Sequence, residues 1–115
     1  MTPEPGGKGL TPSITVAGHT LTVRGELGPE SERAFRDALD QFATVDAEQY
    51  VIDLSEVRYM SSGYVGPIAL LIVEARKKGR PVTVLARPKA ARLLELGGLE
   101  SLAEVRVVGE DKRNG

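Results

Sequence analysis

The sequence predicts a single α/β domain built on a mainly parallel, mixed sheet of about four to five strands. Two observations predict this fold. Short β-rich segments alternate with longer segments of helical periodicity in the order β-β-α-β-α-β-α-β, and strands that are separated by such helices are joined by right-handed crossovers into a parallel sheet. The chain has 115 residues, which is enough for one compact domain and too few for two ordinary ones.

We expect the folded domain to span residues 13–109, between two flexible ends. Residues 1–12 hold three prolines and three glycines without a hydrophobic period, which is typical of a disordered tail. The GGKG sequence in this segment is no phosphate-binding loop, because it lacks the spacing, the preceding strand and the Lys-Ser/Thr ending of that motif. Residues 110–115 read EDKRNG and predict a polar tail.

The first element of the domain is a predicted β-hairpin over residues 13–27. Apolar and polar residues alternate from Ile14 to Val16, the sequence AGH turns the chain, and the alternation resumes at Leu21. The turn contains His19, the one histidine of the chain. We expect it to be a surface turn residue rather than a ligand.

A helix is predicted over residues 28–45. Gly28 fits the N-cap and Pro29 the first helical position, and glutamates follow at the positive end of the helix dipole. Its apolar stripe consists of Ala34, Phe35, Ala38, Leu39 and Phe42. Its charged face consists of Arg33, Arg36, Asp37 and Asp40. That face is either solvated or a partner surface, and solvation is the simpler hypothesis.

The middle of the chain predicts a central strand and a long buried helix. The strand comprises Tyr50-Val51-Ile52, ends at Asp53 and is expected to be apolar on both faces. The helix follows Ser62 and ends with three cations before Gly79, which fits a C-cap. Most of this helix should be buried, because its apolar positions are Val65, Ile68, Ala69, Ile72 and Ala75, widened by Leu70, Leu71 and Val73.

Three shorter elements complete the expected domain. The segment PVTVLA predicts a strand over residues 81–86, and PKAARLLELGGL predicts a short helix that ends at Gly97-Gly98. The segment LAEVRVVG predicts the last strand, within residues 102–109.

Composition excludes several classes of function. The chain has 15 basic and 16 acidic residues, a balance that gives no argument for nucleic acid or an anionic membrane as a partner. It has no cysteine, which excludes disulfides, thiolate metal sites and cysteine nucleophiles. Every apolar run is shorter than the ~20 residues that a membrane helix needs. We therefore expect a cytoplasmic protein that is not an enzyme and that uses no metal or other cofactor.

Two segments of the chain resemble a known family. VIDLSEVRYMSSG, residues 51–63, precedes the long helix, and GRPVTVLARPKAARLLELGGLESL, residues 79–102, follows it. In this order and spacing they resemble a STAS domain, and the resemblance extends over residues 14–108. In bacterial anti-sigma-factor antagonists of this family, a partner kinase that is also the anti-sigma factor phosphorylates a serine at the start of the helix. The unphosphorylated antagonist captures this kinase and frees the sigma factor, and a serine phosphatase resets the switch.

The resemblance implies that Ser62, or otherwise Ser61, is the phosphorylated residue. The commonest family motif is Asp-Ser-Ser-Gly, in which the second serine is modified. Counted without a gap from Asp53, Ser61 falls on the aspartate, Ser62 on the first serine and Gly63 on the modified serine. With a gap of one residue, Ser62 becomes the acceptor and Gly63 the following glycine.

The same two serines also fit a plain structural role, since serine is a preferred N-cap residue. If Ser62 is the cap, Pro67 lies past the first turn and removes one helical hydrogen bond. If the helix begins near Val65 or Gly66 instead, both serines lie on a loop. The sequence leaves both alternatives open.

Further residues near this junction are candidates for partner binding. Asp53 is either a strand-end acid that accepts nearby backbone N–H groups or a residue beside the serines that helps the kinase contact. The resemblance implies a docking surface that contains Asp53, Ser55, Arg58, Tyr59, Gly63 and Tyr64.

The function that follows is a partner-switching regulator of the anti-sigma-factor antagonist type. The alternative is a structural STAS subunit of a scaffold or a lipid-transport complex, which is not phosphorylated. A third class, an enzyme, has no support, because a lone histidine near a turn cannot complete a Ser-His-Asp set. The sequence leaves self-association open.

Overall fold

Strands β1 (Ser13–Ala17) and β2 (Thr20–Leu27) form the predicted hairpin at one edge of a five-stranded sheet. Its turn has Gly18 at a φ of 60° and an exposed His19, as expected for a surface turn. These strands belong to a computed structural model that describes residues 12–110. The two predicted tails lie almost wholly outside these residues and stay predictions.

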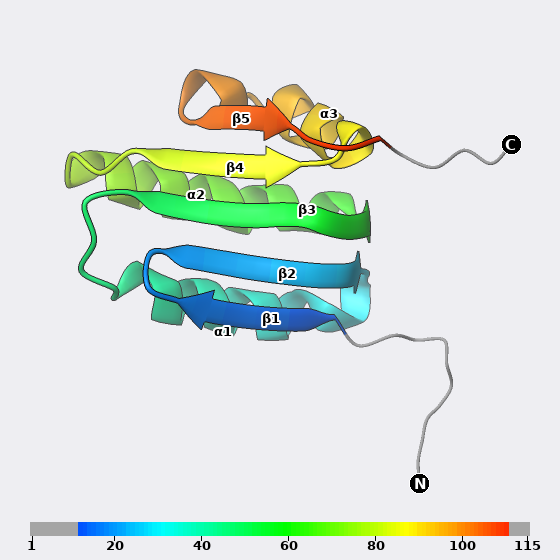
Figure 1. Cartoon of the computed structure of the whole chain (residues 1–115), viewed down its shortest axis with the longest axis horizontal. Helices are drawn as coiled ribbons and strands as arrows, with labels where there is room; N and C mark the ends of the chain where they lie inside the picture. Colours follow the sequence, from blue (N-terminus) through cyan, green and yellow to red (C-terminus); the bar gives the residue numbers. More distant parts are fainter. Residues whose placement is uncertain (1–11, 111–115) are drawn as a thin grey trace, which may run out of the picture.

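The other strands follow in chain order across the sheet (Figure 1). They are β3 (Tyr50–Met60), β4 (Val82–Ala86) and β5 (Glu104–Val107). β1 pairs with β2 antiparallel, and every later neighbouring pair is parallel. The predicted element order and the mainly parallel, mixed sheet are therefore confirmed.

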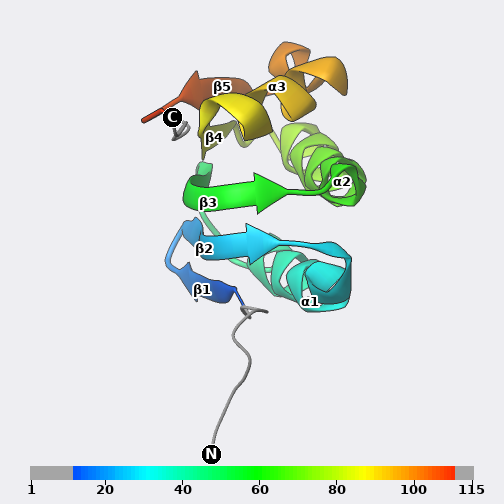
Figure 2. The same ribbon diagram turned by 90° about the vertical axis from the view of Figure 1, so that its right-hand side faces the viewer.

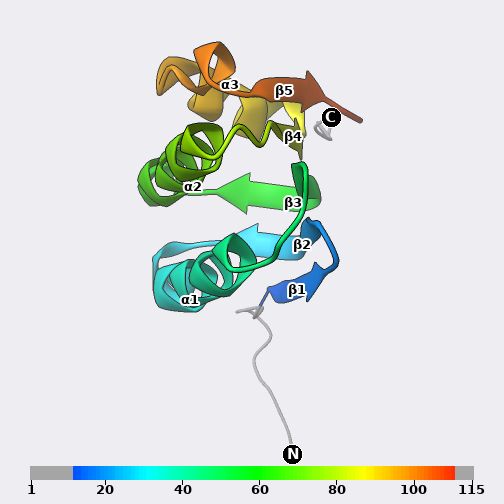
Figure 3. The ribbon, with the colours of Figure 1, turned by 90° about the vertical axis from the view of Figure 1, so that its left-hand side faces the viewer.

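The three α-helices cover a single face of this sheet (Figures 2 and 3). They are α1 (Glu32–Ala43), α2 (Val65–Lys77) and α3 (Pro88–Leu96). Short 3-10 turns precede α1 and α2 and follow α3; they are η1 (Pro29–Ser31), η2 (Ser62–Tyr64) and η3 (Leu99–Ser101). Within residues 12–110, no helix combines the length and the apolar character needed to cross a bilayer.

The prediction that the central strand is apolar on both faces is wrong. Tyr50, Ile52 and Leu54 are buried in the core, whereas Val51 and Asp53 between them are only half-buried. Successive side chains of a strand point to opposite faces, and the helices lie on one face alone. The core therefore forms between the helix layer and one face of the sheet.

The central strand is also longer than predicted, since β3 runs past Asp53 to Met60. Its register against β2 has two irregularities, which place extra residues in β3 and bend it. The buried positions Leu54, Val57 and Met60 are therefore three residues apart rather than two. Because buried and exposed residues do not alternate after Leu54, the sequence pattern did not predict the second half of β3.

Helix α1 starts later than predicted and buries most of the predicted stripe. Gly28 takes the N-cap position of the 3-10 turn η1 rather than of α1 itself. Phe35, Leu39 and Phe42 are buried, whereas Ala34 is exposed and does not belong to the stripe.

Helix α2 begins at Val65, so the serines before it lie outside the α-helix. Pro67 is its third residue, where a backbone N–H has no partner inside the helix, and the proline therefore removes no helical hydrogen bond. The helix is less buried than predicted, because Leu70 is 63% exposed.

Gly97 allows the end of α3 to approach the start of α2. A Cβ atom on Gly97 would lie 2.6 Å from Cγ1 of Val65. We expect Gly97→Ala to lower the free energy of unfolding by about 1–3 kcal/mol in urea titrations, because the packed β-branched side chain has to move.

Gly66→Ala is the matched control for this prediction. Gly66 lies in α2, and apart from its chain neighbours a Cβ atom there meets nothing within 4 Å. We expect this change to alter the free energy of unfolding by less than about 1 kcal/mol, because the helix propensity of alanine is offset by the contact of its Cβ with the ring of the following Pro67. Equal effects of the two substitutions would contradict the close contact at Gly97.

Candidate functional site

The two serines lie on the turn between β3 and α2, next to the matching turn between β2 and α1. Leu27 and Met60 are paired at the carboxyl ends of the parallel strands β2 and β3, so the following turns emerge from one edge of the sheet (Figure 2). The backbone N–H of Ser61 donates to the carbonyl oxygen of Leu27 over 2.9 Å. This bond joins the two turns.

The Ser61 hydroxyl is enclosed within the protein. Its Oγ is buried and has no hydrogen-bond partner among the described residues. Ser61 takes the N-cap position of η2 with φ −77° and ψ 160°, but its side chain makes no capping hydrogen bond. Hydroxyl capping, the plain structural hypothesis for this residue, is therefore wrong.

Ser62 lies at the surface, in contrast to its neighbour. It is the first residue of η2 and is exposed. Its carbonyl oxygen accepts a hydrogen bond from the N–H of Val65, the first residue of α2. The N-cap position of α2 belongs to Tyr64, so Ser62 does not cap this helix.

Tyr64 anchors this turn in the core. Its hydroxyl donates to the carbonyl oxygen of Gly28 over 2.6 Å, and its ring makes an edge contact with Phe35 at a centroid distance of 5.0 Å. Only 1% of the residue is exposed. The prediction that Tyr64 belongs to the docking surface is therefore wrong for its side chain, which ties η2 to η1 and α1.

The environment of Tyr64 raises the pKa of its phenol to about 12. Burial is the main cause, followed by the negative charges of Glu32 and Glu30, while a hydrogen bond with Ser31 acts in the opposite direction. An unfolded tyrosine has a pKa of about 10. The neutral phenol therefore contributes its full stability below about pH 10, and the contribution is lost as the pH rises towards 12.

We expect the free energy of unfolding to fall by roughly 2–3 kcal/mol over this pH range because of Tyr64. Urea titrations at increasing pH on the wild type and on Tyr64→Phe measure it. The variant should lack this part of the alkaline decline, and equal declines in the two proteins would exclude Tyr64 as its cause.

Gly63 completes η2 and lies against an acidic side chain from α1. A Cβ atom on Gly63 would collide with the carboxylate of Glu32. This contact places a negative charge directly beside the residue that follows Ser62. Glu32 was missed as part of the site, although its place in the first turn after the neighbouring parallel strand was a usable signal.

Asp53 and Ser55 lie far from the serines. Oδ1 of Asp53 accepts hydrogen bonds from the backbone N–H of Ser55 at 2.9 Å and from its hydroxyl at 2.6 Å. Met60 is seven residues further along β3, which corresponds to about 20 Å of strand. The hypothesis that Asp53 lies beside the serines is wrong. Its carboxylate accepts a nearby backbone N–H, as its other interpretation expects, but Asp53 lies within β3 rather than at the end of a strand.

Arg58 and Tyr59 lie closer to the junction. Both are exposed near the end of β3, Tyr59 by 55%, and Tyr59 is paired with Glu26 of β2. They stay predicted docking residues. His19 is at the opposite end of the sheet, because the hairpin turn precedes β2 whereas the serines follow β3. Across residues 12–110, no cluster of histidine or acidic side chains could hold a metal ion.

Comparison with known families identifies the chain. The model for the family described as "Mlab, STAS domain" matches residues 10–107. The chain belongs to the STAS domain family. No curated protein has significant sequence similarity to it.

Solved structures agree with this assignment. An anti-sigma factor antagonist from Mycobacterium paratuberculosis has a TM-score of 0.71 at 23% identity, and the match covers 85% of this chain and 86% of that chain. Unphosphorylated SpoIIAA, an anti-sigma factor antagonist, has a TM-score of 0.59 at 18% identity, and the match covers 84% of this chain and 89% of that chain. The protein TM1081 of Thermotoga maritima has a TM-score of 0.63 at 16% identity, and the match covers 94% of this chain and 90% of that chain. These similarities confirm the predicted fold.

Proposed function

We propose that this STAS domain is a phosphorylation-controlled binding module of the anti-sigma-factor antagonist type. In this proposal it captures an anti-sigma factor that is also a serine kinase, in the cytoplasm, and phosphorylation of Ser62 releases that partner. A serine phosphatase then restores the binding form. The observation that carries the proposal is the exposed residue Ser62 on a turn that Tyr64 fixes to the core.

The contrast between the two serines supports Ser62 as the acceptor. A kinase must bring the γ-phosphate of ATP into line with the attacking hydroxyl. Ser62 is exposed, whereas Oγ of Ser61 is buried. Phosphorylation of Ser61 would require the turn to open and its bond to Leu27 to break.

The site also suits a switch that acts on a complex rather than on the fold. A phosphate adds about −1.5 to −2 charges together with three acceptor oxygens. The N-terminus of α2 begins three residues after Ser62 and favours negative charge, while the nearby Glu32 carboxylate opposes it. A partner packed against this turn would meet the new charge and bulk directly.

One further observation supports a binding module over an enzyme, since the fold shared with the solved antagonists leaves function open on its own. His19 lies at the opposite end of the sheet from Ser62, so it cannot act as a general base for the serine.

A structural STAS subunit of a scaffold or lipid-transport complex is the second candidate function. It is favoured by Gly63, which occupies the position of the phosphorylated serine in one alignment with the family motif. Glu32 covers this glycine and would repel a phosphate there. Such a subunit would bind its complex whether or not ATP is present.

Titration calorimetry with a purified anti-sigma-factor kinase of the source organism separates these functions. With ADP we expect a complex of one STAS domain per kinase site. Addition of Mg-ATP should dissociate the wild-type complex but leave the Ser62→Ala complex bound. A complex that ATP does not affect would favour the structural subunit, and failure to bind any such kinase would contradict the antagonist proposal.

A further inference from the structure

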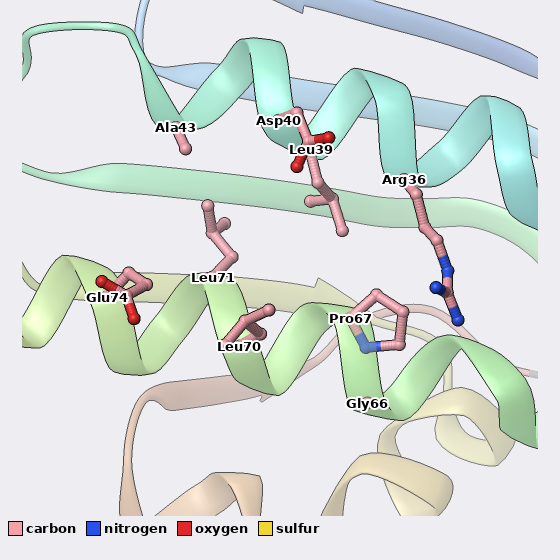
Figure 4. Close-up of a pocket in the computed structure, with 9 residues that line it drawn as sticks. All are labelled: Arg36, Leu39, Asp40, Ala43, Gly66, Pro67, Leu70, Leu71 and Glu74. Atoms are coloured by element: carbon pink, nitrogen blue, oxygen red, sulfur yellow. The ribbon is translucent and has the colours of Figure 1, made fainter.

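A groove of about 500 Å³ lies between α1 and α2 (Figure 4). Its apolar lining consists of Leu39, Ala43, Gly66, Pro67, Leu70 and Leu71, and its charged lining of Arg36, Asp40 and Glu74. Helix α2 differs here from the prediction. The sequence predicts that it is mostly buried, but its Leu70 is 63% exposed. A large apolar side chain over an apolar groove is typical of a binding surface.

The charges along this groove are ordered. Arg36 lies at the end near Pro67, and Glu74 lies at the other end near Ala43, with Asp40 between them (Figure 4). The two helices run in the same direction, since each follows one of two parallel strands. One end of the groove is therefore basic, and the rest is acidic.

These charges are available for contacts with another molecule. The ion pairs found within residues 12–110 involve neither Arg36 nor Asp40. Glu74 lies 3.6 Å from Nζ of Lys77, and both side chains are at least half exposed. Such an exposed pair contributes little, so it does not prevent Glu74 from meeting another cation.

We propose that the α1–α2 groove is the contact surface for a second copy of this chain, related by a two-fold axis that lies in the interface and runs across the groove. This axis reverses the direction of the groove in the second copy. It sets Arg36 at the end of each copy against Glu74 at the opposite end of the other, while Asp40 lies near the axis. Leu70 of each copy then packs against the apolar lining opposite. The charges of the groove become complementary under this reversal, which identifies a second copy of the chain as the molecule bound there. This inference does not depend on the proposed function.

Sedimentation equilibrium over a wide concentration range tests the apolar contact. We expect reversible dimerisation of the wild type. Leu70→Asp should lower the association constant by at least about tenfold, because it puts a charge into the centre of the interface. Leu96→Asp is the matched control: Leu96 is 76% exposed on α3, outside the groove, and its substitution should change the constant by less than about twofold.

Charge reversal tests the orientation of the two copies. Arg36→Glu makes all facing charges acidic, and the double variant Asp40→Arg, Glu74→Arg makes them basic, so each protein should dimerise more weakly than the wild type. In an equimolar mixture, every facing pair is opposite in sign again. The mixture should therefore recover most of the wild-type association, and circular dichroism checks that each variant is folded.

Three results would overturn the proposal: a monomer at every concentration, a dimer that Leu70→Asp leaves intact, or a mixture that associates no better than its two components. A monomer would leave the groove for a helix of another protein. The experiment contains neither kinase nor ATP. Its failure is therefore distinguishable from a failure of the antagonist proposal.

Discussion

Ser62→Asp is expected to weaken the complex with an anti-sigma-factor kinase by at least about tenfold, because a like charge or an unpaired charge in an interface costs one to several kcal/mol. The substitution puts a carboxylate on the exposed first residue of η2. It carries less charge than a phosphate, so the phosphorylated protein should bind more weakly still.

The fold should tolerate the same change. Ser62 is exposed, and the two charge effects at this position oppose each other. The start of α2 attracts a carboxylate, whereas Glu32, which lies against Gly63, repels it. We therefore expect the free energy of unfolding to change by less than about 1 kcal/mol.

Titration calorimetry measures the affinity, and Ser62→Asn is the matched control. Asparagine has the shape of aspartate without its charge, so it should weaken the complex much less. An equal loss for the two variants would mean that bulk rather than charge disrupts the interface. Unchanged binding by Ser62→Asp would mean that this residue lies outside it.

Tyr64→Ala should have the largest effect on stability, a loss of about 3–5 kcal/mol in the free energy of unfolding. The residue is 1% exposed, and its ring contacts Phe35. Its hydroxyl donates a hydrogen bond to the carbonyl oxygen of Gly28, which lies 36 residues earlier in the sequence. Truncation would leave a cavity and a buried carbonyl oxygen without this partner.

Two tyrosine controls divide this effect in denaturant titrations. Tyr64→Phe removes only the hydroxyl, and should cost about 0.5–2 kcal/mol. Tyr59→Ala removes a tyrosine that is 55% exposed, and should stay within about 0.5 kcal/mol of the wild type. If Tyr64→Ala were no more destabilising than Tyr59→Ala, Tyr64 would not be the anchor of the η2 turn.

The fold was predictable because it depends on local periodicity and on the order of elements. Alternation marked the hairpin, and the three-to-four-residue spacing of Phe35, Leu39 and Phe42 marked α1. The full length of β3 was not predictable in this way, because its bulges depend on pairing with β2. The one-sided helix layer also escaped prediction, since parallel strands usually have both faces covered.

The place of the candidate site was predictable, but its geometry was not. Sequence motifs located the serines before the second helix. Their opposite exposures depend on tertiary contacts, such as the bond from Ser61 to Leu27 in the neighbouring turn. The exposure of Leu70 was not predictable either, because periodicity does not reveal the groove beside α2. For Asp53, periodicity does not give its distance from the serines along the bulged strand β3.

Mapping the phosphate after incubation with the partner kinase and Mg-ATP tests the central claim most directly. Intact mass and peptide analysis of the wild type, Ser61→Ala and Ser62→Ala give the site. The account predicts one phosphate, on Ser62, in the wild type and in Ser61→Ala, and none in Ser62→Ala. A phosphate on Ser61, or no phosphate while the complex with the kinase persists, would contradict it.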